Sequence, residues 1–195
     1  MNGIAHSYLC CMARTYSEMI TLGTAAPAFL LPDTVSEKMI SMNDIKGEKG
    51  TVFMFICNHC PFVVHVNDEI VKLANDYKEK GIGFIAISAN DVVKHPDDGP
   101  DKMKAIAENL NYPFPYCYDE TQDVAKAFGA ACTPDFFIYD ANNLLVYRGQ
   151  LDDSRPGNGI PVTGTDIRKA LDNLISNEPV SIEQRPSIGC NIKWK

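Results

Sequence analysis

The residues best suited to do chemistry are two cysteines separated by two residues, Cys57 and Cys60, within the segment CNHCP. An apolar run typical of a buried strand precedes them, and a stretch with helical periodicity follows, with Pro61 in the expected first turn. A thiol at a helix N-terminus is stabilised as the thiolate by the helix dipole and by unpaired N–H groups. His59, when protonated, is expected to lower the thiol pKa further. The spacing therefore predicts a redox-active dithiol.

A metal site is the other chemistry that this spacing allows, because C-x-x-C also forms half of many zinc centres. A tetrahedral site needs a second pair of ligands, and the chain has no second C-x-x-C and no H-x-x-x-H. A carrier of copper(I) or zinc, with Cys57, Cys60 and either His59 or Cys190 as ligands, is therefore kept only as a third hypothesis. We expect no cofactor and no resident metal.

The other cysteines have less distinctive surroundings. Cys132 lies two residues before Pro134 and either approaches the dithiol or serves as a small buried apolar residue. Cys117 lies between two tyrosines on an expected strand and is interpreted as structural. Cys190, in the closing segment SIGCNIKWK, either swings in to resolve an oxidised Cys57 or Cys60 or sits on a docked tail.

Composition excludes several classes of function. With 18 basic against 25 acidic residues, the net charge is −7, and no basic stripe is visible, so nucleic acid is not an expected partner. No apolar run reaches the length of a membrane span, and the first residues make a poor signal peptide. Seven cysteines in 195 residues are too few for a disulfide scaffold. We therefore expect a cytoplasmic protein with no membrane partner.

The elements that must position the dithiol follow a recognisable order. Two apolar runs, 51–57 and 82–88, flank a helix that starts at Pro61, which predicts a right-handed parallel βαβ unit. The pattern then predicts a helix around 103–110, an edge strand over 112–118, a short helix capped by Thr121 that ends near Gly129, a hairpin of 135–139 with 144–148, and a final helix from Thr165.

These elements predict an α/β fold, a three-layer α/β/α sandwich with a mixed central sheet. Residues 29–45 are expected to add a small strand pair at the front, and a C-terminal tail closes the chain. We expect one domain over residues 21–195, preceded by a flexible N-terminal tail over residues 1–20.

Several motifs together resemble the thioredoxin-like superfamily, and within it the peroxiredoxin-related AhpC/TSA branch of bacterial redoxins. They are CNHCPF, the front extension GTAAPAFLL, the segment ACTPDFFIYD and the closing RPSIGCNIKWK, so the resemblance spans residues 22–195. It implies that Pro134 follows a cis peptide bond and faces the dithiol, and that Thr133 offers its backbone to a bound disulfide. It also implies that Cys57 attacks and Cys60 resolves.

The chain departs from the peroxiredoxin pattern P-x-x-x-T-x-x-C. With Cys60 aligned to the peroxidatic cysteine, Cys57 stands at the threonine and Phe53 at the proline. A dedicated peroxide pocket is therefore in doubt, whereas thiol–disulfide exchange needs only an accessible thiolate and a partner sulfur. The long loop 149–164 carries Arg155, which either brings a positive charge toward a thiolate or is a solvated surface residue.

The first hypothesis is thus a thiol–disulfide oxidoreductase acting on protein or small-molecule disulfides and thiols, and re-reduced by a thioredoxin- or glutathione-type partner. The alternative is a thiol-dependent, antioxidant peroxidase that consumes peroxide, with Cys190 or the neighbouring cysteine resolving the sulfenic acid.

Overall fold

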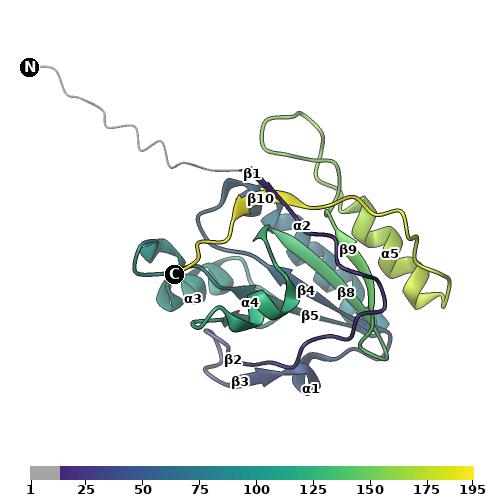
Figure 1. Cartoon of the computed structure of the whole chain (residues 1–195), viewed down its shortest axis with the longest axis horizontal. Helices are drawn as coiled ribbons and strands as arrows, with labels where there is room; N and C mark the ends of the chain where they lie inside the picture. The colour runs from purple at the N-terminus through teal and green to yellow at the C-terminus, as the bar shows by residue number, and fades with distance from the viewer. Residues whose placement is uncertain (1–13) are drawn as a thin grey trace, which may run out of the picture.

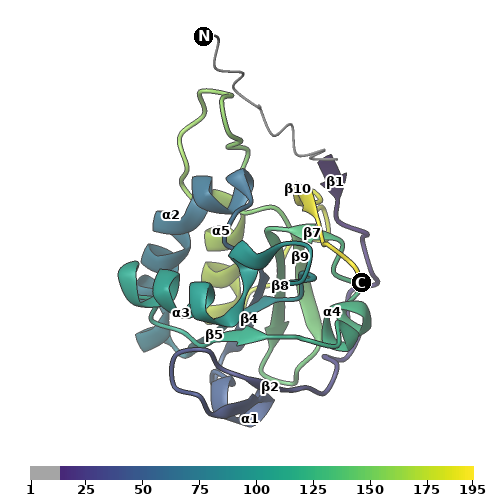
Figure 2. The ribbon, with the colours of Figure 1, turned by 90° about the vertical axis from the view of Figure 1, so that its left-hand side faces the viewer.

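The computed structural model describes residues 14–195 of the chain (Figures 1 and 2). Its strands are β1 Arg14–Tyr16, β2 Leu30–Pro32, β3 Met39–Ser41, β4 Gly50–Phe55, β5 Ile82–Ser88, β6 Tyr116–Tyr118, β7 Cys132–Thr133, β8 Asp135–Asp140, β9 Leu145–Gly149 and β10 Ile188–Asn191. Its helices are α1 Met42–Ile45, α2 Pro61–Tyr77, α3 Pro100–Asn109, α4 Asp123–Phe128 and α5 Thr165–Ile175, with 3₁₀ turns η1 Lys78–Lys80 and η2 Pro96–Asp98.

A five-stranded mixed sheet in the order β6-β5-β4-β8-β9 forms the centre of the fold. β4 and β5 are parallel and connected through α2, so the expected βαβ unit is confirmed. β8 runs antiparallel to β4 on its other side and forms a hairpin with β9. β6 lies at the edge, as its two neighbouring prolines predict.

Apolar side chains of β4 alternate between two cores, one on each face of the sheet. Val52, Met54 and, directly after the strand, Ile56 pack in the core that α2, α3 and α5 cover. Phe53 and Phe55 pack in the other, under α4, α1 and the β2–β3 pair. Figure 2 shows this layering edge-on, with α2, α3 and α5 on one side and α4 on the other. The three-layer sandwich and the front strand pair are confirmed.

A second, three-stranded sheet in the order β1-β10-β7 was not anticipated. Residues 14–16 fall within the expected flexible tail but pair with β10, so this part of the tail is folded (Figure 1). The backbone N–H of Ser17 also donates to the carbonyl of Ser187 at 2.9 Å. These strands are only two to four residues long and pair across most of the chain, so no local pattern marks them. The rest of the expected tail, residues 1–13, lies outside the described residues.

The cap of one helix differs by one residue from the prediction: Gln122, not Thr121, is the N-cap of α4. The last helix, α5, begins at Thr165 as predicted, with Gly164 as its N-cap, and both Gln122 and Gly164 adopt positive φ. Thr121 still accepts a hydrogen bond from the Asp123 N–H at 3.3 Å. Within residues 14–195, no helix has the length and apolar character needed to cross a bilayer.

Candidate active site

The dithiol lies where strand β4 passes into helix α2. Cys57 follows the end of the strand, and Cys60 is the N-cap of the helix, with Pro61 in its first turn. The carbonyl of Cys60 accepts the first helical hydrogen bonds, from the N–H groups of Val63 and Val64 at 2.9 Å. Both side chains are buried, Cys57 with 2% and Cys60 with 0% of its surface exposed. The strand–dithiol–helix arrangement predicted from the sequence is therefore present.

The short strand β7, just before β8, brings Thr133 against both sulfurs. The Thr133–Pro134 peptide bond is cis, as the family resemblance implied. The Thr133 hydroxyl lies 3.3 Å from the Cys57 Sγ, and its carbonyl lies 3.2 Å from the Cys60 Sγ. A hydroxyl can donate to a Cys57 thiolate, and a carbonyl can accept from a Cys60 thiol. Thr133 therefore shapes both positions through different atoms.

A third sulfur lies beside the dithiol. The Sγ of Cys190 is 2.6 Å from the Sγ of Cys60, and Cys190 has only 3% of its surface exposed. It lies on β10, directly opposite Thr133 in the pairing of β10 with β7. Cys190 is therefore already in place and needs no swing of the tail. The same pairing occupies backbone of Thr133, which the resemblance expected to be offered to a bound disulfide.

The pKa values of the two dithiol cysteines move in opposite directions. Hydrogen bonds with Cys190 and Cys57, in that order, hold the pKa of Cys60 well below its ordinary value. The hydrogen bond with Cys60, together with burial, raises the pKa of Cys57 well above its ordinary value. In the reduced protein the negative charge therefore rests on Cys60, and Cys57 keeps its proton. The expected lowering at the helix N-terminus applies to Cys60 alone.

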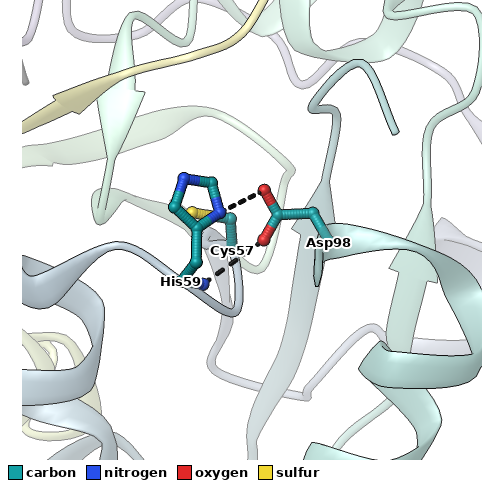
Figure 3. Close-up of side chains that lie close together, drawn as sticks. All are labelled: Cys57, His59 and Asp98. Atoms are coloured by element: carbon teal, nitrogen blue, oxygen red, sulfur yellow. Dashed lines mark hydrogen bonds and ion pairs between the residues drawn. The ribbon is translucent and has the colours of Figure 1, made fainter. Parts of the chain in front are cut away.

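The His59 ring forms an ion pair with Asp98, so its charge is not free to act on the cysteines alone (Figure 3). Its Nδ1 lies 2.7 Å from an Asp98 carboxylate oxygen, and the carboxylate has no exposed surface. The hydrogen bond with Asp98 raises the pKa of His59. Burial acts to raise the pKa of Asp98, but the hydrogen bonds with His59 and Asn90 outweigh it, so the pKa is lowered. The imidazolium charge is thus largely neutralised by a carboxylate.

Asp98 also holds the backbone of the dithiol segment, a role that the sequence analysis missed. Its carboxylate accepts hydrogen bonds from the N–H groups of Asn58 at 2.8 Å and His59 at 3.3 Å, and from the Asn90 amide at 2.7 Å. The Asn58 side chain in turn accepts a hydrogen bond from the Tyr116 hydroxyl at 3.1 Å. The only sequence signal for Asp98 was the acidic loop that follows β5.

Cys57, His59 and Asp98 place ligand atoms within 4.8 Å of one another, which invites a test as a metal site. The donor set could suit zinc, but every contact of the carboxylate is already used. One oxygen accepts two backbone N–H groups, and the other accepts His59 Nδ1 and the Asn90 amide. A metal would have to replace these bonds. The cluster is therefore best described as a hydrogen-bonded ion pair beside a thiol.

Two further cysteines of the described residues, Cys132 and Cys117, lie in other surroundings than Cys57, Cys60 and Cys190. Cys132 precedes Thr133 on β7, and its Sγ lies 3.6 Å from the Pro134 carbonyl. Burial raises its pKa, so it is an inert thiol of the interior. Burial also raises the pKa of Cys117, to about 12, and Cys117 packs in the core beneath α4. Both therefore fit the structural interpretation.

Arg155 does not direct its charge at a sulfur. Its guanidinium donates to the carbonyls of Asp152 and Ser154, each at 2.6 Å, and to the side chain of Gln150. It lines a small pocket together with Pro134. Arg155 therefore stabilises its own loop near the cis-proline, which answers the question left open by the sequence.

Comparison with known proteins places the chain among redox proteins. Residues 22–148 match the AhpC/TSA family. Thiol-disulfide oxidoreductase ResA of Bacillus thuringiensis is 26% identical over 132 residues, which cover 68% of this chain and 71% of ResA. Putative peroxiredoxin MT2597 of Mycobacterium tuberculosis is 27% identical over 116 residues, which cover 60% of this chain and 68% of that protein.

Two solved structures are informative in different ways. An uncharacterized conserved protein from Geobacillus kaustophilus is 58% identical, with a TM-score of 0.93, and the match covers 94% of this chain and 97% of that one. The thioredoxin domain of a thiol-disulfide oxidoreductase from Bacteroides vulgatus is 20% identical, with a TM-score of 0.56 over 67% of this chain and 89% of that one, which shows a shared fold. The chain belongs to the AhpC/TSA family and has a thioredoxin-like fold.

Proposed function

We propose that this protein is a thiol–disulfide oxidoreductase in which Cys57 attacks the substrate disulfide and Cys60 resolves the mixed disulfide. One observation carries the proposal: the two cysteines meet at a strand-to-helix junction, and Thr133, next to cis-Pro134, contacts both sulfurs. The activity named for ResA agrees with this chemistry.

The enclosure of the two sulfurs supports these two roles. The Sγ of Cys60 is held between the Thr133 carbonyl and the Cys190 sulfur, so a substrate sulfur has no room there. Cys57 keeps a small exposed surface and is hydrogen-bonded to Cys60. For Cys57 to attack, its proton must pass along this hydrogen bond to Cys60, and the Thr133 hydroxyl then stabilises the Cys57 thiolate that forms before the attack. Once deprotonated again, Cys60 attacks Cys57 and releases the reduced substrate.

The substrates we propose are protein or small-molecule disulfides, with a thioredoxin- or glutathione-type reductant to close the cycle. We also propose that the protein acts in the cytoplasm, where a dithiol is kept reduced. The unit that we propose carries the activity extends the expected domain of residues 21–195 to include β1 and Ser17, which pack against it.

The test is reduction of a protein disulfide, such as that of insulin, with dithiothreitol as the electron source. Replacing the nucleophile, Cys57→Ser, is expected to lower the rate to that of dithiothreitol alone, because serine cannot form the mixed disulfide. The matched control is Cys117→Ser, a buried cysteine on the opposite face of the sheet, which is expected to keep wild-type activity. Full activity in Cys57→Ser would show the proposal to be wrong.

A peroxidase is the second candidate, favoured by the low pKa of Cys60 and by the relative named a putative peroxiredoxin. Against it, Phe53 stands at the proline position of the peroxiredoxin pattern. Its ring packs between those of Phe29 and Phe128, with centroid separations of 5.6 and 4.9 Å, in the core on the other face of the sheet from the dithiol. Stopped-flow mixing with hydrogen peroxide separates the two candidates. Rapid, saturable consumption of peroxide that is lost in Cys60→Ser would favour the peroxidase.

A further inference from the structure

The sulfur of Cys190 adjoins the Cys60 sulfur of the dithiol. We propose that Cys190 is a third redox-active cysteine, which forms a disulfide with Cys60 and so moves the oxidised bond from Cys57–Cys60 to Cys60–Cys190. This inference rests on the proposed function, since it starts from the Cys57–Cys60 disulfide. The observation that carries it is the 2.6 Å separation of the Cys60 and Cys190 sulfurs.

Strand pairing fixes Cys190 in this position. It is opposite Thr133 in β7 and opposite Arg14 in β1, so β10 is the central strand of its sheet. The close approach depends on Gly189: a Cβ there would lie 2.0 Å from the Thr133 carbonyl oxygen and 3.1 Å from the Pro134 nitrogen. A residue without a side chain therefore lets β10 lie directly on the loop that faces the dithiol.

Both flanks of β10 are also anchored. The Ser187 hydroxyl donates to the carbonyl of Gly149 at 2.7 Å on one side. On the other side, the Lys193 N–H donates to the Asn90 side chain at 2.8 Å. Asn90 in turn bonds Asp98, so the tail after β10 is linked to the network that holds the dithiol segment. A thiol held in this way has a high effective concentration at the Cys60 sulfur.

The neighbouring cysteine on β7 lacks this geometry. Cys132 and Thr133 are successive residues of a strand, so their side chains point to opposite faces. Thr133 faces the dithiol, and Cys132 bonds the Pro134 carbonyl instead. Cys190 is therefore the one we assign to this role among the cysteines in residues 14–195.

The exchange balances without an external oxidant. Cys190 gives up its proton, and its thiolate attacks the Cys60 sulfur of the Cys57–Cys60 disulfide. The S–S bond to Cys57 breaks, and Cys57 leaves as a thiolate that takes up a proton in its turn. One disulfide is present before and after, so the protein stays oxidised by two electrons. In the reverse step, Cys57 attacks Cys60 and releases Cys190.

As a consequence, the oxidised protein has a free Cys57 thiol again, while the disulfide lies between the buried Cys60 and Cys190. β10 lies beyond residues 22–148, the part of the chain that matches the AhpC/TSA family, so the third thiol comes from outside the shared segment. The chain thus adds a step to the two-cysteine cycle from its own C-terminal strand.

The primary test uses the wild-type chain and needs no substitution. The protein is equilibrated with oxidised dithiothreitol, alkylated in acid, and digested with trypsin, which places both dithiol cysteines in residues 50–72 and Cys190 in residues 170–193. A Cys57–Cys60 bridge stays within one peptide, whereas a Cys60–Cys190 bridge joins two. We expect both species; an oxidised protein in which Cys190 is fully alkylated would overturn the inference.

Variants assign the bridge and separate it from the proposed function. Oxidised Cys57→Ser is expected to give only the two-peptide bridge, and oxidised Cys190→Ser only the one-peptide bridge. The control, Cys132→Ser, is expected to keep the wild-type ratio of the two. Insulin reduction reports on the dithiol alone: activity that depends on Cys57, without any two-peptide bridge, would reject the inference and keep the proposed function. A two-peptide bridge together with insulin reduction that survives Cys57→Ser would keep the Cys60–Cys190 bridge and reject the proposed function.

Discussion

At the scale of single residues, the ion pair of His59 and Asp98 sets the charge next to the dithiol. Folding raises the pKa of His59 and lowers that of Asp98. The pair therefore stabilises the fold between these two pKa values. Its contribution is lost as the pH rises through the raised pKa of His59, and also as the pH falls through the lowered pKa of Asp98. The loop after β5 thus keeps the dithiol segment in place over the neutral range.

Removal of the buried carboxylate tests this pairing. In Asp98→Asn, the pKa of His59 is expected to fall toward about 6.5, its unperturbed value. His95 stacks on His59 with ring centroids 5.5 Å apart, and burial and the His59 charge lower its pKa. The Asp98 carboxylate acts to raise the pKa of His95, and His59 is still largely protonated at the pH where His95 titrates, so the pKa of His95 is expected to fall slightly in the same variant. An NMR pH titration of both imidazoles measures the two shifts.

The matched control is Asp97→Asn, which removes an exposed carboxylate next in the chain. It is expected to leave both titrations close to those of the wild type. An unchanged pKa of His59 in Asp98→Asn would contradict the ion pair.

At the scale of elements, β10 performs two tasks through one short strand. It completes the sheet with β1 and β7, and it places Cys190 beside the dithiol. This docking requires a residue without a side chain: Gly189 lies against the Thr133 carbonyl, and a Cβ on it would be 2.0 Å from the carbonyl oxygen. The strand is therefore sensitive to the smallest possible addition at that residue.

The substitution Gly189→Ala is expected to loosen β10. Overpacking costs about 1–3 kcal/mol, which raises the population of the undocked strand about 5- to 150-fold. The rate at which iodoacetamide alkylates Cys190 in the reduced, folded protein should rise by the same factor, as measured on the peptide of residues 170–193. Gly157→Ala, at a positive-φ residue with open space around it, is the control for backbone strain alone. Equal alkylation rates in the two variants would contradict the docking argument.

At the scale of the whole molecule, a buried ion pair connects distant parts of the chain. Arg148 on β9 has no exposed surface, and its guanidinium lies 3.2 Å from the carboxylate of Asp135 on β8 and 2.6 Å from the Gly129 carbonyl after α4. The same carboxylate accepts a hydrogen bond from the Ser17 hydroxyl at 2.7 Å. The segment before the family match, through Ser17, and the segment after α4, through Gly129, are thus attached to one buried charge pair.

Disruption of this pair is expected to destabilise the entire fold. Arg148→Met leaves the Asp135 carboxylate buried without its cation and should lower the free energy of unfolding by about 3–5 kcal/mol. Arg185→Met is the matched control: its side chain is 70% exposed and pairs with Asp153 in solvent, so a much smaller loss is expected. Urea unfolding under reducing conditions measures both. A loss in Arg148→Met no larger than in the control would show that the buried pair adds nothing.

Local patterns in the sequence determined the central fold and the location of the dithiol. The apolar runs 51–57 and 82–88 with a helix between them can form little other than a βαβ unit, because both faces of such strands must be buried. That unit alone puts Cys57 and Cys60 at a helix N-terminus. The family resemblance added the cis bond before Pro134. The AhpC/TSA match confirms the family, and the structure has the cis bond.

The tertiary structure alone decided the partners of these residues. Asp98 reaches His59 from a different loop, and Cys190 reaches Cys60 from a strand 130 residues further along the chain. A contact of this kind depends on how loops and short strands close over the core, and two- to four-residue strands carry too little periodicity to be recognised. The sequence therefore determined which chemistry is present, whereas long-range packing decided which groups surround each sulfur and where the charge resides.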